Sequence, residues 1–445
     1  MHAAPTETAP AGTAPPVPAR HPGAALTYPA VLALITLCGA ALAFLRLPPV
    51  ARDTMWAEDG TIFLEDAASH GPRSLLEPYA GYLHFLPRVL AQLVVALASP
   101  EQYALWVTAV SCLALGLVAA LTYHCAQAVT DSTALRLAFA SIPVVVAPGA
   151  FESSGNLANL HWYLLWLMPW LLFKPAMRRM EGVVLFTAAA CAALTEIQTL
   201  LFLPLLLLVF RSRRHLPAAL GLLLGGAPQV YVTLTHPRID SLEHTLNWLS
   251  VPNGYALHSS SSILFGPAPR IGAIISGFGP APIIVACVLL TAPVILVLWT
   301  GNGRQRLAGI VFFCASLMVW AATQVLNAYP ALDYAEFQAD DWLTNFFSTR
   351  YSTAPSMFLL ACVPLAAAAV RNRGTIRADR SAALLLGAFT ALQLVYFFPS
   401  QTARSAGPEW SPQFETVRAQ CDAGTDTVSI ESAPEWWDPV ILRCP

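Results

Sequence analysis

The sequence predicts an all-α polytopic membrane protein with about eleven transmembrane helices. Three observations support this fold class. The 445-residue chain is 56% hydrophobic and has a mean hydropathy of +0.57. Only 11% of its residues are Asp, Glu, Lys or Arg, against about 25% in a typical soluble domain. Long apolar segments also alternate with short arginine-bearing loops, as in a chain that crosses a bilayer repeatedly. The net charge of −2 gives no indication of nucleic-acid binding.

The chain begins with a polar segment. Residues 1–27 are rich in Ala, Pro and Thr, and this composition predicts a disordered cytoplasmic tail. The tail is too polar for a signal peptide, and the apolar run that follows has no cleavage-site pattern. That run, 28–47, has roughly the 20 residues needed to cross the hydrocarbon core. We therefore expect it to remain in the protein as the first membrane anchor.

Basic loops set the predicted orientation. Four short loops carry clusters of Lys or Arg, and a fifth, around Asp131, has Arg136 beside it. The positive-inside rule predicts that all five are cytoplasmic. The four clusters are Lys174/Arg178/Arg179, Arg211/Arg213/Arg214, Arg304/Arg306 and Arg371/Arg373/Arg377/Arg380. The spans that fit these loops are 28–47, 102–124, 135–150, 160–173, 182–195, 199–210, 216–234, 281–299, 307–327, 354–370 and 381–398. Eleven crossings place the N-terminus inside and the C-terminal segment 399–445 outside.

Segment 83–99 is apolar but short, and it carries His84 and Arg88. If it crossed the membrane, the loop that contains Lys174 would move to the outside. We therefore predict a helix that lies in the outer interface. The extracytoplasmic loops of the membrane domain 28–398 are then 48–101, 151–159, 235–280 and 328–353.

Acidic residues are concentrated on the predicted outer side. Of the 26 acidic residues, only Glu7, Asp131, Glu181 and Asp379 fall on the cytoplasmic side, which leaves 22 outside. Because acidic residues steer membrane insertion weakly, this bias indicates a function outside. The sequence contains no P-loop and no G-x-G-x-x-G following a strand. The substrate is therefore not expected to be ATP or a nucleotide sugar.

Two adjacent acids, Glu58 and Asp59 in the sequence W-A-E-D-G, are the main candidate catalytic residues. Glu65 and Asp66 follow seven residues later, a spacing that returns each acid to the same face of a helix. A general base that deprotonates a sugar hydroxyl needs a carboxylate with a tunable pKa, and a neighbouring acid or low-dielectric surroundings raises it. The alternative is a solvated acidic helix at the membrane surface.

The same loop continues with Tyr79, Tyr82, His84 and Arg88 as candidate substrate-binding residues. Aromatic rings provide stacking faces, and an arginine guanidinium provides a fork for phosphate. An aromatic belt with one basic anchor at the membrane interface is the alternative.

The later loops contribute Asn159, His161, Glu196 and Arg350 as further substrate-binding candidates. Amides and a histidine at the mouth of the bilayer suit polyol recognition, although Asn-rich turns also form for backbone reasons. Glu196 interrupts a 29-residue apolar run, so it either marks the turn of a hairpin or opens into a site. Arg350 stands before a predicted span, where it could meet a lipid phosphate or act as an anchor.

The nine cysteines show no metal-ligand spacing, so no protein metal site is predicted. Seven lie in or beside apolar segments. Cys421 and Cys444 lie in the polar segment 399–445, and a disulfide between them is expected if that segment is outside the cell.

The predicted cytoplasmic N-terminus, single span and long first outer loop with an early acidic pair resemble the GT-C superfamily of membrane glycosyltransferases. The resemblance is carried by W-A-E-D-G, by G-Y-L-H-F-L-P-R at 81–88, and by the topology. It implies a polyprenyl-phosphate-linked sugar as donor and a hydroxyl of an extracytoplasmic glycan, lipid or protein as acceptor. It also implies Asp59 or Glu58 as the base and Arg88 and Arg350 as phosphate ligands. No cofactor is required, and a divalent cation (Mg or Mn) is an option. The segment 399–445 is smaller than the soluble domain of many GT-C enzymes.

Two other functions fit parts of the sequence. One is a transporter or flippase of a lipid-linked or polar solute, although such proteins usually show internal repeats and polar residues at mid-membrane. The other is a non-catalytic membrane partner of cell-envelope synthesis. Arginine-rich usage with a single lysine, Lys174, indicates a GC-rich genome and hence a bacterial plasma membrane.

Overall fold

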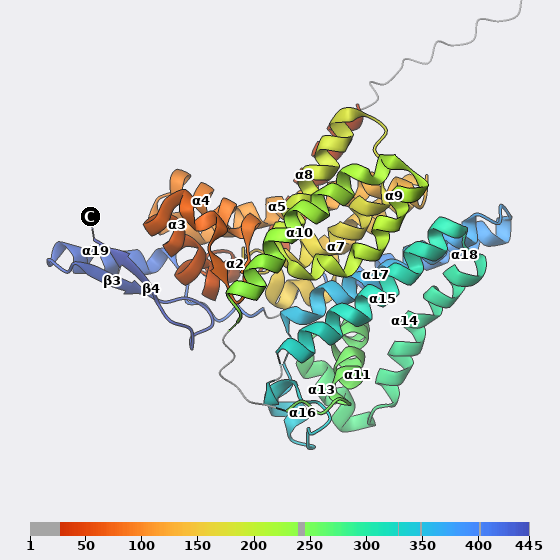
Figure 1. Cartoon of the computed structure of the whole chain (residues 1–445). Helices are drawn as coiled ribbons and strands as arrows, with labels where there is room; N and C mark the ends of the chain where they lie inside the picture. The colour runs from red at the N-terminus through yellow and green to blue at the C-terminus, as the bar shows by residue number, and fades with distance from the viewer. Residues whose placement is uncertain (1–26, 239–244, 328, 348, 400–401, 445) are drawn as a thin grey trace, which may run out of the picture.

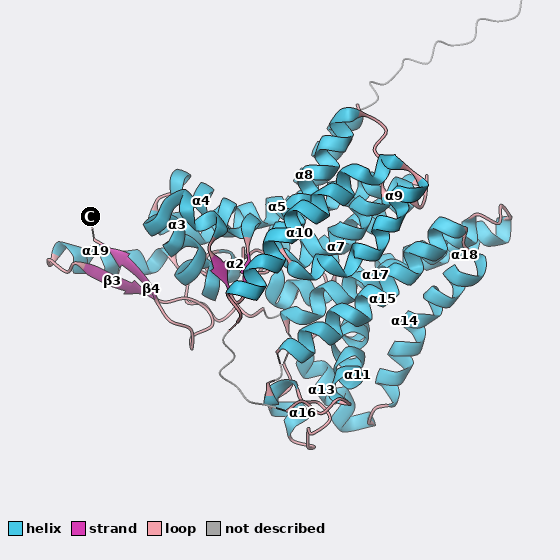
Figure 2. Ribbon diagram, viewed as in Figure 1, coloured by secondary structure: helices cyan, strands magenta, loops and turns pink. Residues whose placement is uncertain are grey.

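The computed structural model describes residues 27–238, 245–327, 329–347, 349–399 and 402–444. The predicted disordered tail, apart from its last residue, lies outside them. The described chain is mostly helical, and its strands form two short antiparallel hairpins (Figure 2). The long helices are α1 (Tyr28–Arg46), α5 (Tyr103–Cys125), α6 (Thr133–Val145), α7 (Leu160–Phe173), α8 (Arg179–Thr195), α10 (Leu216–Thr235), α14 (Ala281–Thr300), α15 (Gly303–Leu326), α17 (Thr353–Arg371) and α18 (Ile376–Val395). The shorter helices are α2 (Pro49–Arg52), α3 (Glu65–His70), α4 (Phe85–Leu97), α9 (Leu207–Arg211), α11 (Ser250–Tyr255), α12 (Ser262–Phe265), α13 (Ala268–Phe278), α16 (Asp341–Thr344) and α19 (Phe414–Asp422).

Seven helices in the described residues are long and apolar enough to cross a membrane. They begin at Tyr28, Pro100, Arg213, Ala281, Gly303, Arg350 and Ile376. The chain is thus an all-α polytopic protein suited to a membrane. Four further predicted spans fall on α6, α7, α8 and the segment Ile197–Arg211. Each of these has 17 residues or fewer, so length and composition do not establish the predicted number of eleven.

Helix α17 lies at the centre of the helix assembly, since 94% of its most apolar window is buried, whereas α1 and α18 are mostly exposed along theirs. A helix that is apolar on every side is expected to be enclosed by other helices. Phe358 of α17 packs against Trp166 of α7 and Phe312 of α15, with ring centroids 5.5 and 6.2 Å away. These aromatic contacts join three non-consecutive helices into one core (Figure 1).

The loops gather into two groups, one at each end of the helices. We call one group the basic end: it consists of the loops around residues 126–132, 174–178, 211–215, 301–302 and 372–375. Contacts such as Gln305 Nε2 to the Val129 carbonyl (3.1 Å) and Asn372 Nδ2 to Gln305 Oε1 (2.8 Å) join these loops. The other group, the acidic end, contains residues 48–101, 151–159, 236–238, 329–347 and 349–353, together with the C-terminal residues 402–444.

The predicted interfacial helix corresponds to α4, which begins at Phe85 because Leu83 belongs to a β-hairpin. That hairpin pairs β1 (Pro78–Tyr79) with β2 (Tyr82–Leu83). Pro87, Ala91 and Val94 of α4 are buried, whereas Leu93 and Leu97 are exposed. With 13 residues, α4 is too short to cross a bilayer unaided.

The C-terminal unit consists of α19 and a hairpin of β3 (Thr427–Ile430) with β4 (Val440–Arg443). The structure joins Cys421 of α19 to Cys444 by a disulfide, with the Cα atoms 5.4 Å apart. The unit lies beside the helices of the first loop, at the left of Figure 1. It is therefore positioned to support the acidic motif of residues 56–60.

Candidate functional site

The acidic motif is held by the C-terminal unit. The Ala57 N–H donates to the Ala433 carbonyl (2.7 Å), and the Ala433 N–H donates to the Met55 carbonyl (2.9 Å). A side chain at Gly60 would place its Cβ 2.4 Å from a methyl carbon of Val440, so this contact requires a glycine. The motif is thus fixed to a segment more than 350 residues away in the sequence.

A π-helical turn, η1 (Asp59–Leu64), follows Glu58 and runs into α3. Such turns add a residue to the helical repeat and are frequent at functional sites. The extra residue changes which face each acid occupies, since Glu58 and Asp59 are buried whereas Glu65 is exposed. The prediction that Glu65 and Asp66 share the face of Glu58 and Asp59 is therefore wrong.

Asp59 is fully buried, and both of its carboxylate oxygens accept hydrogen bonds. The Leu157 N–H donates to Oδ2 (2.9 Å), and the Ala158 N–H donates to Oδ1 (2.8 Å). Burial raises the pKa of Asp59 to about 7, against the opposing effects of the two N–H donors and of the Arg404 charge. These contacts join the first loop to the loop 151–159. They favour a positioning role for Asp59 over that of a base, because both oxygens are already engaged by backbone donors and the side chain is not exposed.

Glu58 is placed differently from its neighbour. Its Oε1 lies 3.7 Å from Nη2 of Arg350. Its Oε2 is buried and has no hydrogen-bond partner among the described residues. A buried carboxylate oxygen without a donor is costly, so a bound group that donates a hydrogen bond would stabilise it.

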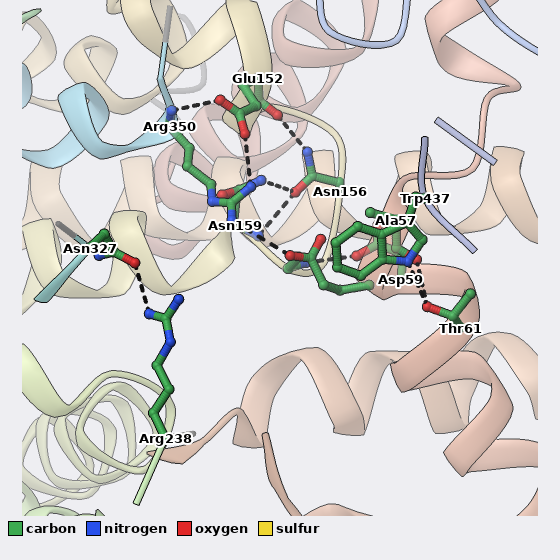
Figure 3. Close-up of polar contacts among 12 residues, drawn as sticks. Ala57, Asp59, Thr61, Glu152, Asn156, Asn159, Arg238, Asn327, Arg350 and Trp437 are labelled. Atoms are coloured by element: carbon green, nitrogen blue, oxygen red, sulfur yellow. Dashed lines mark hydrogen bonds and ion pairs between the residues drawn. The ribbon is translucent and has the colours of Figure 1, made fainter. Parts of the chain in front are cut away.

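Arg350 connects Glu58 to Glu152, as Figure 3 shows for its contacts with Glu152. The Arg350 backbone N–H donates to Glu152 Oε2 (2.7 Å), and Nη1 donates to Oε1 (3.0 Å). Burial raises the pKa of Glu152, and the attraction of Arg350 opposes that rise. The Arg350 side chain keeps 32% of its surface exposed. It can therefore meet a ligand while it holds Glu152.

Asn159 occupies a supporting position. Its backbone N–H (3.0 Å) and its Nδ2 (2.9 Å) both donate to Asn156 Oδ1, and Asn156 Nδ2 donates to the Glu152 carbonyl (2.7 Å) (Figure 3). Asn159 is almost fully buried, so these contacts stabilise the loop rather than present an amide to a substrate. Binding of a substrate by Asn159 remains a prediction, and the observed contacts favour a structural role instead.

Three aromatic residues of the first loop lie together, and the charge of Glu58 acts on the two tyrosines among them. The rings of Tyr82 and His84 have centroids 4.1 Å apart, and Tyr79 lies 5.6 Å from His84. Burial, and after it the nearby charge of Glu58, raise the pKa of the Tyr79 hydroxyl to about 12. Tyr79, Tyr82 and His84 are thus brought together near the acid, as expected for a substrate-binding surface.

The ring of His161 forms a buried hydrogen bond with the Glu196 carboxyl group, and this pair extends the aromatic group. The His161 ring lies 6.3 Å from that of Tyr82 and 6.1 Å from that of His84. The second oxygen of Glu196 accepts a hydrogen bond from the Gln198 N–H (2.8 Å) and caps the 3-10 helix η6 (Ile197–Leu206). Glu196 therefore marks a turn between helices and also contacts a site residue, so both sequence-based interpretations describe it in part.

Arg88 is the predicted site residue that the structure does not bring to Arg350. Its Nη1 donates to Asp66 Oδ2 (2.8 Å), and its guanidinium lies 5.5 Å from the Phe63 ring centroid. With 1% of its surface exposed, it is enclosed between α3 and α4. These contacts favour a structural role over the predicted contact with phosphate. Asp66, His70 and Glu77 form a group close enough to hold a cation. The group is partly exposed, however, and Asp66 is already paired with Arg88.

Sequence reasoning left two arginines of the acidic end out of the candidate set. Arg238 Nη1 donates to Asn327 Oδ1 (2.7 Å), as Figure 3 shows, and the charge of Arg238 acts on Tyr79 together with that of Arg350. Arg404 is buried, and its Nη2 donates to the Ser154 carbonyl (2.8 Å). The position of these arginines on the predicted outer side could have identified them as site candidates, because the positive-inside rule does not account for arginines there.

Several buried polar atoms in and beside the acidic end have no hydrogen-bond partner among the described residues. Besides Glu58 Oε2, they include both ring nitrogens of His84, Nε1 of Trp162 and Oγ1 of Thr349 within the described residues. Native proteins leave few such atoms unpaired, and several in one place indicate that a polar ligand completes them. We call Glu58, Tyr79, Tyr82, His84 and Arg350 the Glu58 cluster. It combines a carboxylate acceptor, a guanidinium fork and aromatic faces.

Comparison of the sequence with protein-family models and with curated proteins gives no significant match. The function is therefore inferred from the residues of the Glu58 cluster.

Proposed function

We propose that this chain is a GT-C-type membrane glycosyltransferase that moves a sugar from a polyprenyl-phosphate donor to an acceptor hydroxyl. The hydroxyl belongs to an extracytoplasmic glycan, lipid or protein. The observation that carries the proposal is the unpartnered Oε2 of Glu58 beside the partly exposed guanidinium of Arg350. These two groups provide the two functions that the reaction needs, a proton acceptor and an anion ligand.

Glu58 acts as the general base in this mechanism. The acceptor hydroxyl donates a hydrogen bond to Oε2, and its proton passes to that oxygen as the hydroxyl oxygen bonds to the anomeric carbon of the donor. The bond between that carbon and the phosphate oxygen breaks at the same time. The leaving polyprenyl phosphate carries away the electron pair, so no nucleotide or redox cofactor is needed.

Arg350 stabilises the phosphate on which negative charge develops. Guanidinium groups bind phosphate through two parallel N–H bonds, and Arg350 uses only Nη1 of its guanidinium nitrogens in a hydrogen bond to Glu152. Glu152 keeps the guanidinium in place. Two acidic groups, Glu58 and Glu152, face the single positive charge of Arg350. Additional positive charge, from Arg238 or from a divalent cation, would therefore help to bind the negatively charged donor.

The aromatic residues supply the sugar-binding surface. Tyr79 and Tyr82 flank His84, and both tyrosines lie within reach of the charges on Glu58 and Arg350. A sugar ring packed on these faces would present its hydroxyls to the unpaired nitrogens of His84 and Trp162. This arrangement suits a polyol better than a flat apolar solute.

The separation of basic and acidic ends supports the predicted topology. Every loop that the positive-inside rule places in the cytoplasm lies at the basic end, and the Glu58 cluster lies at the other. With the basic end in the cytoplasm, the site faces the exterior of a bacterial plasma membrane. Donor and cluster then meet where the polyprenyl chain can enter from the bilayer.

Lipid extracts from a strain that lacks the gene test this function. A transferase predicts an accumulating polyprenyl-phosphate sugar and a glycan that is shorter by that sugar. Complementation with wild type should reverse both changes, whereas the Glu58→Gln variant should reverse neither. A deletion strain with unchanged lipid-linked sugars and unchanged glycans contradicts the proposal.

A further inference from the structure

A groove opens at the basic end of the protein, far from the Glu58 cluster. It has a volume of about 540 Å³ and lies between the starts of α8 and α10. This volume is in the range of small-molecule sites, roughly 300–1,000 Å³. Helix α8 begins at this groove and ends just before Glu196, so its 17 residues separate the two sites by about 25 Å.

Four arginines line the groove: Arg178, Arg179, Arg213 and Arg214. All four are exposed, and none of them forms an ion pair in the described part of the chain. The nearest acid, Glu181, is already occupied by Lys174 Nζ (3.0 Å) and His124 Nε2 (2.8 Å). The groove therefore has uncompensated positive charge.

The walls of the groove are closely packed against each other. The Ala176 N–H donates to the Arg214 carbonyl (2.9 Å), which joins the two arginine-bearing loops. Side by side and parallel, α8 and α10 pack so closely that a Cβ at Gly221 would lie 2.4 Å from the Phe186 carbonyl oxygen. The N-terminus of α8 lies beside these arginines, and no side chain caps it. The partial positive charge of this helix end adds to the positive potential of the groove.

An apolar strip continues from the groove along both helices. Val183 and Leu220 belong to the groove itself and are 56% and 40% exposed. Val184 adds exposed apolar surface on α8, and Leu223 and Leu224 extend the strip about one turn further along α10. A soluble anion or an acidic peptide would use the arginines but not this strip. A molecule with a phosphate at one end and acyl chains at the other would use both.

We propose that this groove binds an anionic phospholipid, with its phosphate on the four arginines and its acyl chains along α8 and α10. Basic pockets between membrane helices bind anionic headgroups through the same combination of charge and apolar contact. The lipid would stabilise the helical hairpin that α8 forms with the following segment, whose turn lies at Glu196. The inference does not depend on the proposed transferase activity, because it concerns the opposite end of the protein.

Native mass spectrometry of the full-length protein in detergent tests this site. Phosphatidylglycerol is titrated against phosphatidylcholine for wild type and for the R178Q/R179Q and R213Q/R214Q variants. We expect wild type to retain one phosphatidylglycerol at least about tenfold more tightly than phosphatidylcholine. Each double variant should lose at least about threefold in affinity, because two phosphate ligands are removed.

The R373Q/R377Q variant is the matched control, since it removes two exposed arginines elsewhere at the basic end, one in the loop before α18 and one in the first turn of that helix. It should bind phosphatidylglycerol within about twofold of wild type. Equal retention by the groove variants, equal retention of phosphatidylcholine by wild type, or displacement of the lipid by millimolar inorganic phosphate would each overturn the proposal. The readout is lipid binding, so loss of transferase activity does not affect the result.

Discussion

Glu58 and Arg350 lie 3.7 Å apart at their closest side-chain atoms, although one belongs to the first loop and the other to the last long loop before α17. Glu152, from a third loop, holds the same guanidinium at 3.0 Å. Three segments that are distant in sequence thus meet at one cation. This convergence makes the Glu58 cluster the centre of the functional account.

Replacement of Arg350 by Lys tests the phosphate ligand. Lysine keeps the charge but loses the planar fork, so we expect the KM for the polyprenyl-phosphate donor to rise about tenfold, equivalent to about 1.4 kcal/mol. Steady-state kinetics with purified protein measure this effect. Arg73→Lys, at an exposed arginine of the first loop, is the control. An unchanged donor KM in Arg350→Lys would exclude the proposed contact.

Replacement of Asp59 by Asn tests its role in positioning. The variant turns one acceptor oxygen into a donor that faces a backbone N–H from Leu157 or Ala158, and we expect a loss of about 1–3 kcal/mol in the free energy of unfolding. Thermal unfolding in detergent measures this loss. A variant with wild-type stability would show that the two backbone contacts contribute little.

The same carboxyl predicts a pH dependence. Because burial raises the pKa of Asp59 to about 7, the folded state keeps a proton there that the unfolded chain releases near pH 4. The Asp59 contribution to stability is thus greatest below pH 4, decreases as the pH rises towards 7, and is constant above that value. Unfolding midpoints at pH 5 and pH 8 should differ more in wild type than in Asp59→Asn. Equal differences would place the pKa outside this window.

Arg88 is predicted to affect stability more than turnover. Arg88→Met removes the ion pair with Asp66, and we expect it to cost about 1–3 kcal/mol while the KM for the donor stays within about twofold of wild type. Unfolding and kinetic measurements on the same preparation separate the two effects. A large rise in donor KM at normal stability would restore Arg88 as a phosphate ligand.

The disulfide of the C-terminal unit supports the acidic motif at a distance. Removal of the Cys421–Cys444 bond with the C421S/C444S variant should lower stability by about 2–4 kcal/mol. It should also loosen the contact of Trp437 Nε1 with Thr61 Oγ1 (3.0 Å). Unfolding midpoints with and without reductant provide the measurement. If neither reduction of wild type nor the C421S/C444S variant changes the unfolding midpoint, the packing of the C-terminal unit alone holds it in place.

The sequence was most informative where the membrane imposes a physical constraint. Apolar length and arginine position follow from bilayer thickness and charge asymmetry, so each predicted span coincides with a helical segment. The sequence also predicts Glu58, Tyr82 and Arg350 as site residues, because polar groups are costly next to a bilayer, and the structure brings these three candidates together.

The remaining features depend on long-range packing. The π turn after Glu58 rotates the later acids away from the first pair, and no local signal in the sequence predicts it. Whether an acid binds a backbone, as Asp59 does, or stays unpaired, as Glu58 Oε2 does, depends on a loop about 100 residues further along the chain. For the same reason, the sequence could not distinguish Arg88 from Arg350 as a phosphate ligand. The ion pair of Arg88 with Asp66 forms only when the tertiary fold brings the two residues together.

The most direct test of the account compares Glu58→Gln with Glu65→Gln in a sugar-transfer assay with the lipid-linked donor that accumulates in the deletion strain. Both variants replace an acid of the first loop by its isosteric amide, but only Glu58 lies beside Arg350. The account predicts that Glu58→Gln loses at least about 100-fold in kcat, as expected for loss of a general base, while Glu65→Gln keeps wild-type turnover. Wild-type turnover in a folded Glu58→Gln protein would contradict it.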